Sequence, residues 1–139
     1  MPKTFRLSVI TPEHTFFSGE AEMVSVEAID GRLCVLPGHA PTVCSLAQGE
    51  MVIRLPGGET KNAAASDGFM TVTQDETVMM LQAAEWPEDI DRVRAQRAER
   101  KAREALIQKQ DRQSYLANQA MLLRAMTRLR VSGKGRVNQ

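Results

Sequence analysis

The side chains of this sequence that could carry out chemistry are few. Cys34, His39, Cys44 and His14 form the only group that could suggest a metal site or a nucleophile. The ten-residue spacing of the cysteines matches no zinc signature, and no third group would orient a Cys34–His39 pair. Motifs for phosphate loops, dinucleotides, serine nucleophiles, zinc proteases and calcium loops are missing as well. We therefore interpret the N-terminal half as a binding and packing module, and we expect no metal and reduced cysteines.

A second group of residues is basic and lies in the last third of the chain. Arg94 and Lys101 are seven residues apart and Arg124 and Arg128 are four apart, so each pair shares a face of an expected helix. If the chain reverses between the helices, the numbers of facing residues add up to about 224. The four cations then converge with Asp91 nearby. A polyanion between the helices, such as a nucleoside triphosphate, would relieve their mutual repulsion.

The basic residues are also compatible with two roles that involve no nucleotide. The cations can point into water or meet an acidic protein surface. A basic tail can also bind nucleic acid. Against nucleic acid, Tyr115 is the only aromatic residue after Trp86, so a platform for stacking bases is missing.

The charge distribution divides the chain into two parts. Residues 1–86 carry 5 Lys and Arg against 11 Asp and Glu, a net charge of −6, and residues 87–139 carry 13 against 6, a net charge of +7. No apolar run approaches the roughly 20 residues of a membrane helix. The first residues lack the apolar core of a signal peptide. These features exclude a secreted mini-protein and a membrane-spanning protein.

The first part has the hydrophobic period of β-strands. Phe5–Ile10 and Val24–Ala28 alternate apolar and polar residues. Met51–Leu55 and Glu59–Ala65 flank the turn Pro56–Gly58 and form the best hairpin candidate. Turn signals recur about every 8 to 12 residues. We predict an α+β protein whose N-terminal domain is an antiparallel β-sandwich or flattened barrel of about eight to ten short strands.

The second part has the composition of two helices. Pro87–Lys109, with its proline in the first helical position, contains many helix formers, and a second helix is expected over Tyr115–Arg130. Asp111 or Ser114 can cap the second helix, which should end before Ser132–Gly133. The apolar residues between the helices are mostly alanines, which bury little area. We predict a weakly held antiparallel hairpin that can act as a switch.

Five stretches of the chain, in order and over its whole length, resemble the epsilon subunit of the F-type proton-translocating ATP synthase of bacteria. They are Ser18–Glu20, Asp30–Pro41, Ser66–Val72, Asp89–Ala95 and Leu123–Leu129. The most specific of them contains Pro-Gly-His-Ala-Pro, and another matches the motif Ile/Leu-Asp-x-x-Arg-Ala.

The resemblance implies a non-catalytic subunit of the central stalk of a rotary motor for ATP synthesis and proton transport. Residues 1–86 would be the β-sandwich domain that binds the gamma subunit and the c-subunit ring. Residues 87–139 would be the helical hairpin, which can extend toward the catalytic alpha/beta head and inhibit ATP hydrolysis. The subunit would lie at the cytoplasmic face of the bacterial cell membrane, peripheral and attached only through the complex, with no nucleic acid partner.

The resemblance also implies site residues. In some bacterial members ATP binds the compact hairpin as a regulatory ligand and no cofactor is obligatory. The matching positions are Ile90, Asp91, Arg94, Ala95, Arg124 and Arg128. Arg32, His39 and Pro41 match positions at the rotor interface.

Three positions depart from the family pattern. Arg32 stands where members often carry an acidic residue, and a polar contact there would need a partner of different charge. Cys34 replaces a glycine, which makes the local backbone less permissive. Lys101 stands where ATP-binding members tend to carry arginine, so a point charge replaces a bidentate fork.

Three hypotheses remain. The chain is a regulatory subunit of a rotary ATP synthase, a free-standing ATP sensor that uses the hairpin alone, or a basic nucleic-acid-binding adaptor.

Overall fold

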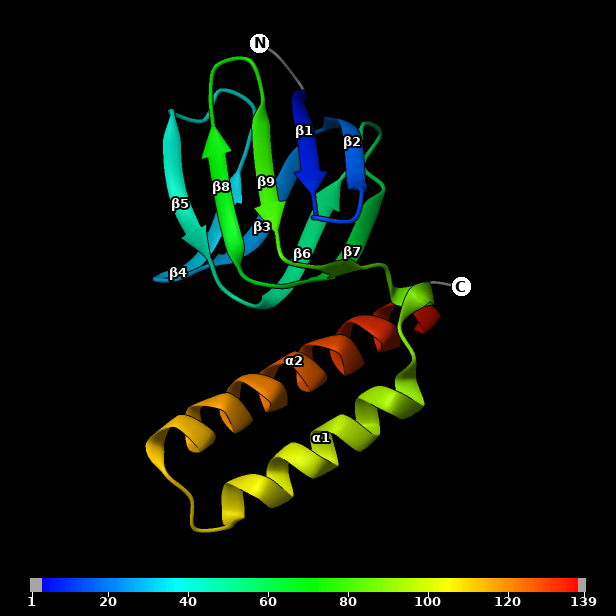
Figure 1. Cartoon of the computed structure of the whole chain (residues 1–139). Helices are drawn as coiled ribbons and strands as arrows, with labels where there is room; N and C mark the ends of the chain where they lie inside the picture. Colours follow the sequence, from blue (N-terminus) through cyan, green and yellow to red (C-terminus); the bar gives the residue numbers. More distant parts are fainter. Residues whose placement is uncertain (1–3, 138–139) are drawn as a thin grey trace. The chain divides into compact units, whose positions relative to one another are not determined.

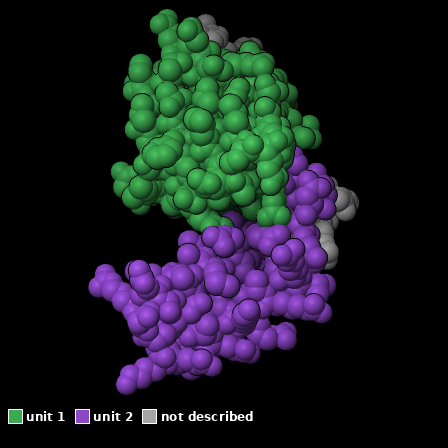
Figure 2. Space-filling view, viewed as in Figure 1, with its two compact units in different colours: residues 1–85 green, residues 86–139 purple. Residues whose placement is uncertain are grey.

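The two-residue hydrophobic period of the first 85 residues produces ten strands. The computed structural model describes residues 4–137, with side chains up to residue 133. It divides into two compact units, residues 1–85 and 86–139, which Figure 2 shows in different colours. The strands are β1 Phe5–Ile10, β2 Thr15–Ala21, β3 Met23–Ala28, β4 Gly31–Val35, β5 Thr42–Leu46, β6 Gly49–Arg54, β7 Thr60–Ala65, β8 Gly68–Val72, β9 Thr77–Leu81 and β10 Ala84–Glu85.

One ten-stranded sheet connects these strands and curls into two layers (Figure 1). The order is β10-β7-β6-β3-β5-β8-β9-β1-β2, with β4 paired to β3. The pairing of β1 with β9 is parallel, and the other pairs are antiparallel. β3 links the layers because it pairs with both β6 and β5. The predicted sandwich or flattened barrel is confirmed.

The core of the sandwich is aliphatic, as a chain with 4% aromatic residues requires. Leu7 and Val9 of β1 are fully buried, whereas Arg6 and Ile10 of the same strand are exposed. This alternation is the one predicted for a strand with one buried face. Side chains with no exposed area from four further strands complete the core: Val24, Met51, Ile53, Met70 and Met79.

Gly68 begins β8 at a point where the backbone of β9 leaves no room for a side chain. A β-carbon there would overlap the carbonyl oxygen of Met80 and lie 2.9 Å from the Cα atom of Leu81. We expect Gly68→Ala to lower the free energy of unfolding by about 2–3 kcal/mol, measured by urea denaturation, because backbone atoms cannot rotate away. Gly19→Ala is the control, since its β-carbon would meet the Phe17 ring at an ordinary 3.7 Å. Equal losses in the two variants would show that the crowding at Gly68 does not matter.

The helical unit begins with a short turn before its first long helix. The 3-10 helix η1 covers Pro87–Asp89, Ile90 returns to extended backbone, and α1 spans Arg92–Ile107. Asp91 is the N-cap of α1, because its Oδ1 accepts the backbone N–H of Arg94 at 3.0 Å. The predicted helical start at Pro87 is therefore confirmed for η1 only, and the prediction that the long helix starts there is wrong. The carboxylate cap places the start of α1 five residues later.

The second helix, α2 (Arg112–Val137), packs alongside α1 (Figure 1). Arg92 and Arg103 of α1 both contact α2. Ala95 and Ala102 lie between these arginines on the same face of α1, and both are fully buried. Val93, by contrast, is 57% exposed. The α1 side of the seam therefore consists of alanines, as the sequence predicts.

The second helix, α2, is longer than predicted. It spans Arg112–Val137 and continues past Ser132 and Gly133. A glycine inside a helix costs about 1 kcal/mol, and the full burial of Val131 offsets this cost. Within residues 4–137, no helix is both long enough and apolar enough to cross a membrane.

Candidate functional site

Three exposed apolar side chains form a row across the outer face of the sandwich. Phe69 on β8 pairs with Met80 on β9, and Met80 pairs in turn with Ile10 on β1. Ser45 on β5 continues the row beside Phe69. Phe69 is 61% exposed and Met80 is 60% exposed, because both occupy the outward positions of their strands. We call Ile10, Met80 and Phe69 the apolar row.

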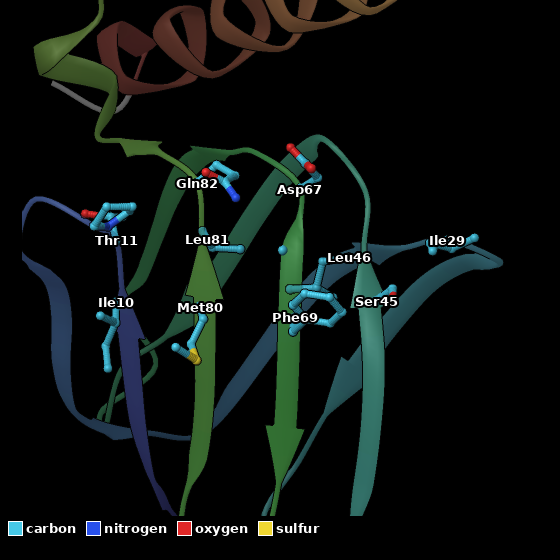
Figure 3. Close-up of a pocket in the computed structure, with 12 residues that line it drawn as sticks. Ile10, Thr11, Ile29, Ser45, Leu46, Asp67, Phe69, Met80, Leu81 and Gln82 are labelled. Atoms are coloured by element: carbon cyan, nitrogen blue, oxygen red, sulfur yellow. The ribbon is translucent and has the colours of Figure 1, made fainter.

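The apolar row borders a hollow of about 670 Å³ (Figure 3). Leu46 and Leu81 contribute to its lining, and Asp67 and Gln82 provide polar groups at one end. Ile29, which is 72% exposed, stands on the β3–β4 turn at the side of this surface. An apolar centre with a polar rim is the usual composition of a protein–protein interface. This face of the sandwich is therefore suited to hold a partner protein.

The residues predicted to contact the rotor lie on β4 and in the loop that follows it. The Arg32 side chain is 39% exposed, and its Nη1 lies 3.3 Å from Oε2 of Glu27. His39 is half-buried, and its Nδ1 donates to the carbonyl oxygen of Ala40 at 2.8 Å. Pro41 is exposed. All three are accessible to a partner, and their contact with the rotor stays a prediction.

Three of the residues predicted to bind a nucleotide shape the start of α1. Ile90 is 7% exposed and Ala95 is fully buried. Asp91 caps the helix through the backbone of Arg94. These residues fix where α1 begins and how closely it approaches α2, whatever ligand the hairpin holds.

The remaining predicted nucleotide-binding residues come from both helices. Arg94 is exposed in the first turn of α1, while Arg124 is exposed and Arg128 half-buried on α2. Nη1 of Arg92 lies 3.5 Å from Oγ of Ser132. The numbers of these two residues add up to the predicted 224, so Arg94 is level with the turn of α2 that follows Arg128. The three arginines are thus on adjoining helices, and their convergence on a ligand stays a prediction.

The predicted pairing of Lys101 with Arg124 stays a prediction. Lys101 is exposed on α1. Two residues further along, Nη2 of Arg103 lies 3.8 Å from the sulfur of Met126 on α2.

Asp111 caps the second helix and makes its first turn sensitive to acid. Its Oδ1 accepts the backbone N–H of Ser114 at 2.7 Å. Hydrogen bonds from the backbone and then the side chain of Ser114 lower the pKa of Asp111. A carboxyl group whose pKa is lower in the folded state stabilises that state at neutral pH. This stabilisation is complete above the ordinary pKa of an aspartate. It is lost as the pH falls from that value through the lower pKa that Asp111 has in the folded chain.

We expect the first turn of α2 to fray on acidification. The amide chemical shifts of residues 112–116, followed by NMR, should report this titration. Asp111→Asn keeps a capping oxygen and should remove the pH dependence. The same titration in the Asn variant would contradict the assignment to Asp111.

The two cysteines lie on strand faces that point in different directions. Cys34 is exposed beside the buried Val35, whereas Cys44 is half-buried beside Val43, which is 75% exposed. Burial raises the pKa of the Cys44 thiol, and the nearby charge of Asp30 adds to the effect. In the described part of the chain, no group of three or more His, Cys, Asp or Glu residues could hold a metal ion.

Family models match both parts of the chain in order. The model of the beta-sandwich domain of the ATP synthase delta/epsilon chain matches residues 4–87, and that of the long alpha-helix domain of the same chain matches residues 88–133. The chain belongs to the ATP synthase delta/epsilon chain family. The resemblance inferred from the sequence motifs is therefore confirmed, and with it the order of a β-sandwich and helices.

Curated members of the delta/epsilon family match this chain over nearly its whole length. The ATP synthase epsilon chain of Caldanaerobacter subterraneus subsp. tengcongensis is 40% identical over 134 residues, which are 96% of this chain and 97% of that protein. The ATP synthase epsilon chain of Bacillus velezensis is 38% identical over 131 residues, 94% of this chain and 98% of that protein. The chain is thus an epsilon-type member of the family.

Solved structures share the fold of this delta/epsilon chain at low sequence identity. A chain in the mitochondrial ATP synthase of Euglena gracilis, solved as OSCP/F1/c-ring, matches with a TM-score of 0.81 at 20% identity, covering 99% of this chain and 83% of that one. A chain in the central stalk/c-ring structure of the mitochondrial ATP synthase of Tetrahymena thermophila has a TM-score of 0.63 at 16% identity, with 96% of each chain covered.

The apolar row is the feature of this delta/epsilon chain that the sequence patterns do not single out. The alternation of β1 places Ile10 on its polar side, and no motif draws attention to Met80 as part of a surface. The sequence feature that could have indicated this surface is an apolar residue at an outward position of a strand. Ile10 is such a residue, because it follows Leu7 and Val9 on the polar side of the alternation.

Proposed function

We propose that this chain is a non-catalytic subunit of the central stalk, and that its sandwich couples the gamma subunit to the c-subunit ring. The apolar row carries the proposal. Phe69, Met80 and Ile10 lie in register on three adjacent strands and leave a hollow beside them. A contiguous exposed apolar patch beside a hollow suits a protein partner.

We place the gamma subunit on the apolar row and the c ring on the β4 side of the sandwich. The β4 side carries the accessible Arg32, His39 and Pro41. Because Arg32 replaces an acidic residue of the family pattern, the c-ring loop that meets this region should be less basic than usual or acidic.

The decisive experiment for docking is co-purification. Tagged full-length chain, added to ATP synthase from which this subunit has been removed, should retain the gamma subunit and the c ring. A free-standing ATP sensor or a nucleic-acid adaptor would retain neither. Failure to retain gamma would exclude the central-stalk function.

The helical hairpin is proposed to regulate ATP hydrolysis by opening and extending toward the alpha/beta head. The α1 side of the seam is made by Ala95 and Ala102, whose small side chains bury little apolar area, and Arg92 and Arg103 make long contacts with α2. A hairpin held in this way can be displaced by a partner whose affinity differs between the states by a few kcal/mol.

ATP is proposed to favour the compact hairpin by binding near Arg94, Arg124 and Arg128. Calorimetry of the full chain with millimolar ATP should give a saturable heat of binding. The affinity for ATP should be at least about tenfold lower in Arg94→Ala or Arg124→Ala, since each substitution removes a charged hydrogen bond to phosphate. Arg100→Ala, at an exposed position of α1, is the matched control and should bind as the wild type does. Absence of heat with the wild-type chain would remove ATP from the proposal.

The chain is proposed to work at the cytoplasmic face of the bacterial cell membrane. Its attachment there would be peripheral and would depend on the gamma subunit and the c ring. Removal of these partners should release the chain from membranes.

A further inference from the structure

Strand β3 changes partners along its length, and Arg32 lies over the point of change. Met23–Ser25 pair with β6, and the last pair of that ladder joins Ser25 to Val52. Further on, Ala28 pairs with Leu46 of β5. β3 and β6 therefore part after Ser25, where β3 passes from one layer of the sandwich to the other.

The side chain of Arg32 connects three strands across this parting. It belongs to β4, its Nε donates to Oγ of Ser25 on β3 at 2.9 Å, and its Nη1 donates to the carbonyl oxygen of Glu50 on β6 at 2.6 Å. Nη1 also contacts Oε2 of Glu27 at 3.3 Å, and Nη2 contacts the carbonyl oxygen of Ser25 at 3.4 Å. A guanidinium has about five N–H donors, so most of them are used inside the sheet.

The turn between β3 and β4 carries Ile29. Ile29 stands at the side of the docking surface, which is the apolar row together with the hollow beside it. Ile29 is 72% exposed, so its side chain has little packing of its own. Its position depends on its backbone, whose N–H donates to the carbonyl oxygen of Ser45 at 3.2 Å. Gly31 closes the turn with a φ of +134°, a conformation that favours glycine. The geometry of this turn is therefore set by the strands on either side of it.

We propose that Arg32 is a positioning residue that bridges β3, β4 and β6 and thereby holds Ile29 in place to complete the docking surface. Toward the gamma subunit, Arg32 acts through the β3–β4 turn and not by direct contact. Lysine cannot replace it, because a single ammonium cannot reach Ser25 and Glu50 with the geometry of a planar fork. The inference rests on the proposed docking of the sandwich to gamma and the c ring.

Two measurements on the same variants test this role. The variants are Arg32→Lys, which keeps the charge, Ser25→Ala, which removes one acceptor, and Ile29→Ala, which removes the positioned side chain. Hydrogen exchange of residues 28–34 is measured on the free full-length chain, and affinity is measured for ATP synthase stripped of this subunit. Arg54→Lys is the control, because Arg54 makes a comparable side-chain contact elsewhere, with Glu22 at 3.6 Å.

A positioning role predicts that Arg32→Lys and Ser25→Ala both speed exchange in the turn about five- to tenfold and weaken docking several-fold. Ile29→Ala should weaken docking without speeding exchange, and adding Arg32→Lys to it should cause little further loss of affinity.

Two results would overturn the inference. The first is weaker docking of Arg32→Lys with unchanged exchange, while Ser25→Ala docks as the wild type does, because this would mean that Arg32 contacts the partner directly. The second is faster exchange with unchanged docking. If the wild-type chain does not dock, the proposed function fails. The hydrogen-exchange rates of the free chain still report whether Arg32 holds the turn, so this failure can be told apart from a failure of the bridging contacts.

Discussion

Met80→Asp is expected to weaken the association of the chain with gamma and the c ring by about a hundredfold or more, because docking would bury an unpaired carboxylate. Met80 is the middle member of the apolar row, with Phe69 and Ile10 as its cross-strand neighbours. It is 60% exposed in the chain alone, so the substitution should leave the fold intact. Surface-based binding assays with immobilised gamma–c-ring assembly measure this loss.

The control for Met80→Asp adds the same charge away from the row. Thr60→Asp changes an exposed residue at the start of β7 and should bind as the wild type does. If the two aspartates weaken binding equally, the effect is one of net charge. The apolar row would then have no special part in docking.

Ala102→Glu is expected to lower ATP hydrolysis by the reassembled complex about tenfold, by driving the hairpin into the extended state that we propose to be inhibitory. Ala102 is fully buried in the seam between α1 and α2. A glutamate in that position must either separate the helices or bury its charge, and both cost more than the roughly 1.4 kcal/mol that shifts an equilibrium tenfold. Steady-state hydrolysis, compared in complexes with equal amounts of bound subunit, gives the result.

Gln96→Glu provides the matched control for the seam. Gln96 is exposed on the same helix, so its substitution introduces the same side chain without opening the hairpin. Hydrolysis should be unchanged. Unchanged hydrolysis in Ala102→Glu as well would show that opening of the hairpin does not control the enzyme.

Local patterns in the sequence are sufficient to predict much of this fold. The alternation at Leu7 and Val9 depends only on neighbouring residues, and the Pro56–Gly58 turn determines the β6–β7 hairpin. The helix limits are less accurate because capping competes with propensity. The carboxylate of Asp91 moves the start of α1, and buried packing carries α2 past Gly133.

The apolar row and the Arg32 contacts are not predictable from these local patterns. Ile10 meets Met80 only because β1 and β9 pair in parallel across about 70 residues of sequence. Arg32 reaches Glu50 only because β3 leaves β6 at that point. Both features depend on the register of strands distant in the sequence, whereas the family motifs identify the subunit without that knowledge.

Photo-crosslinking in the assembled complex tests the docking of the sandwich most directly. Benzoylphenylalanine placed at Phe69 should form a covalent adduct with the gamma subunit on irradiation, and the same group at Lys61, exposed on β7, should not. An adduct from position 69 with gamma would establish which face meets the rotor. An adduct from Lys61 alone, or none from position 69 in fully assembled complexes, would contradict docking through the apolar row.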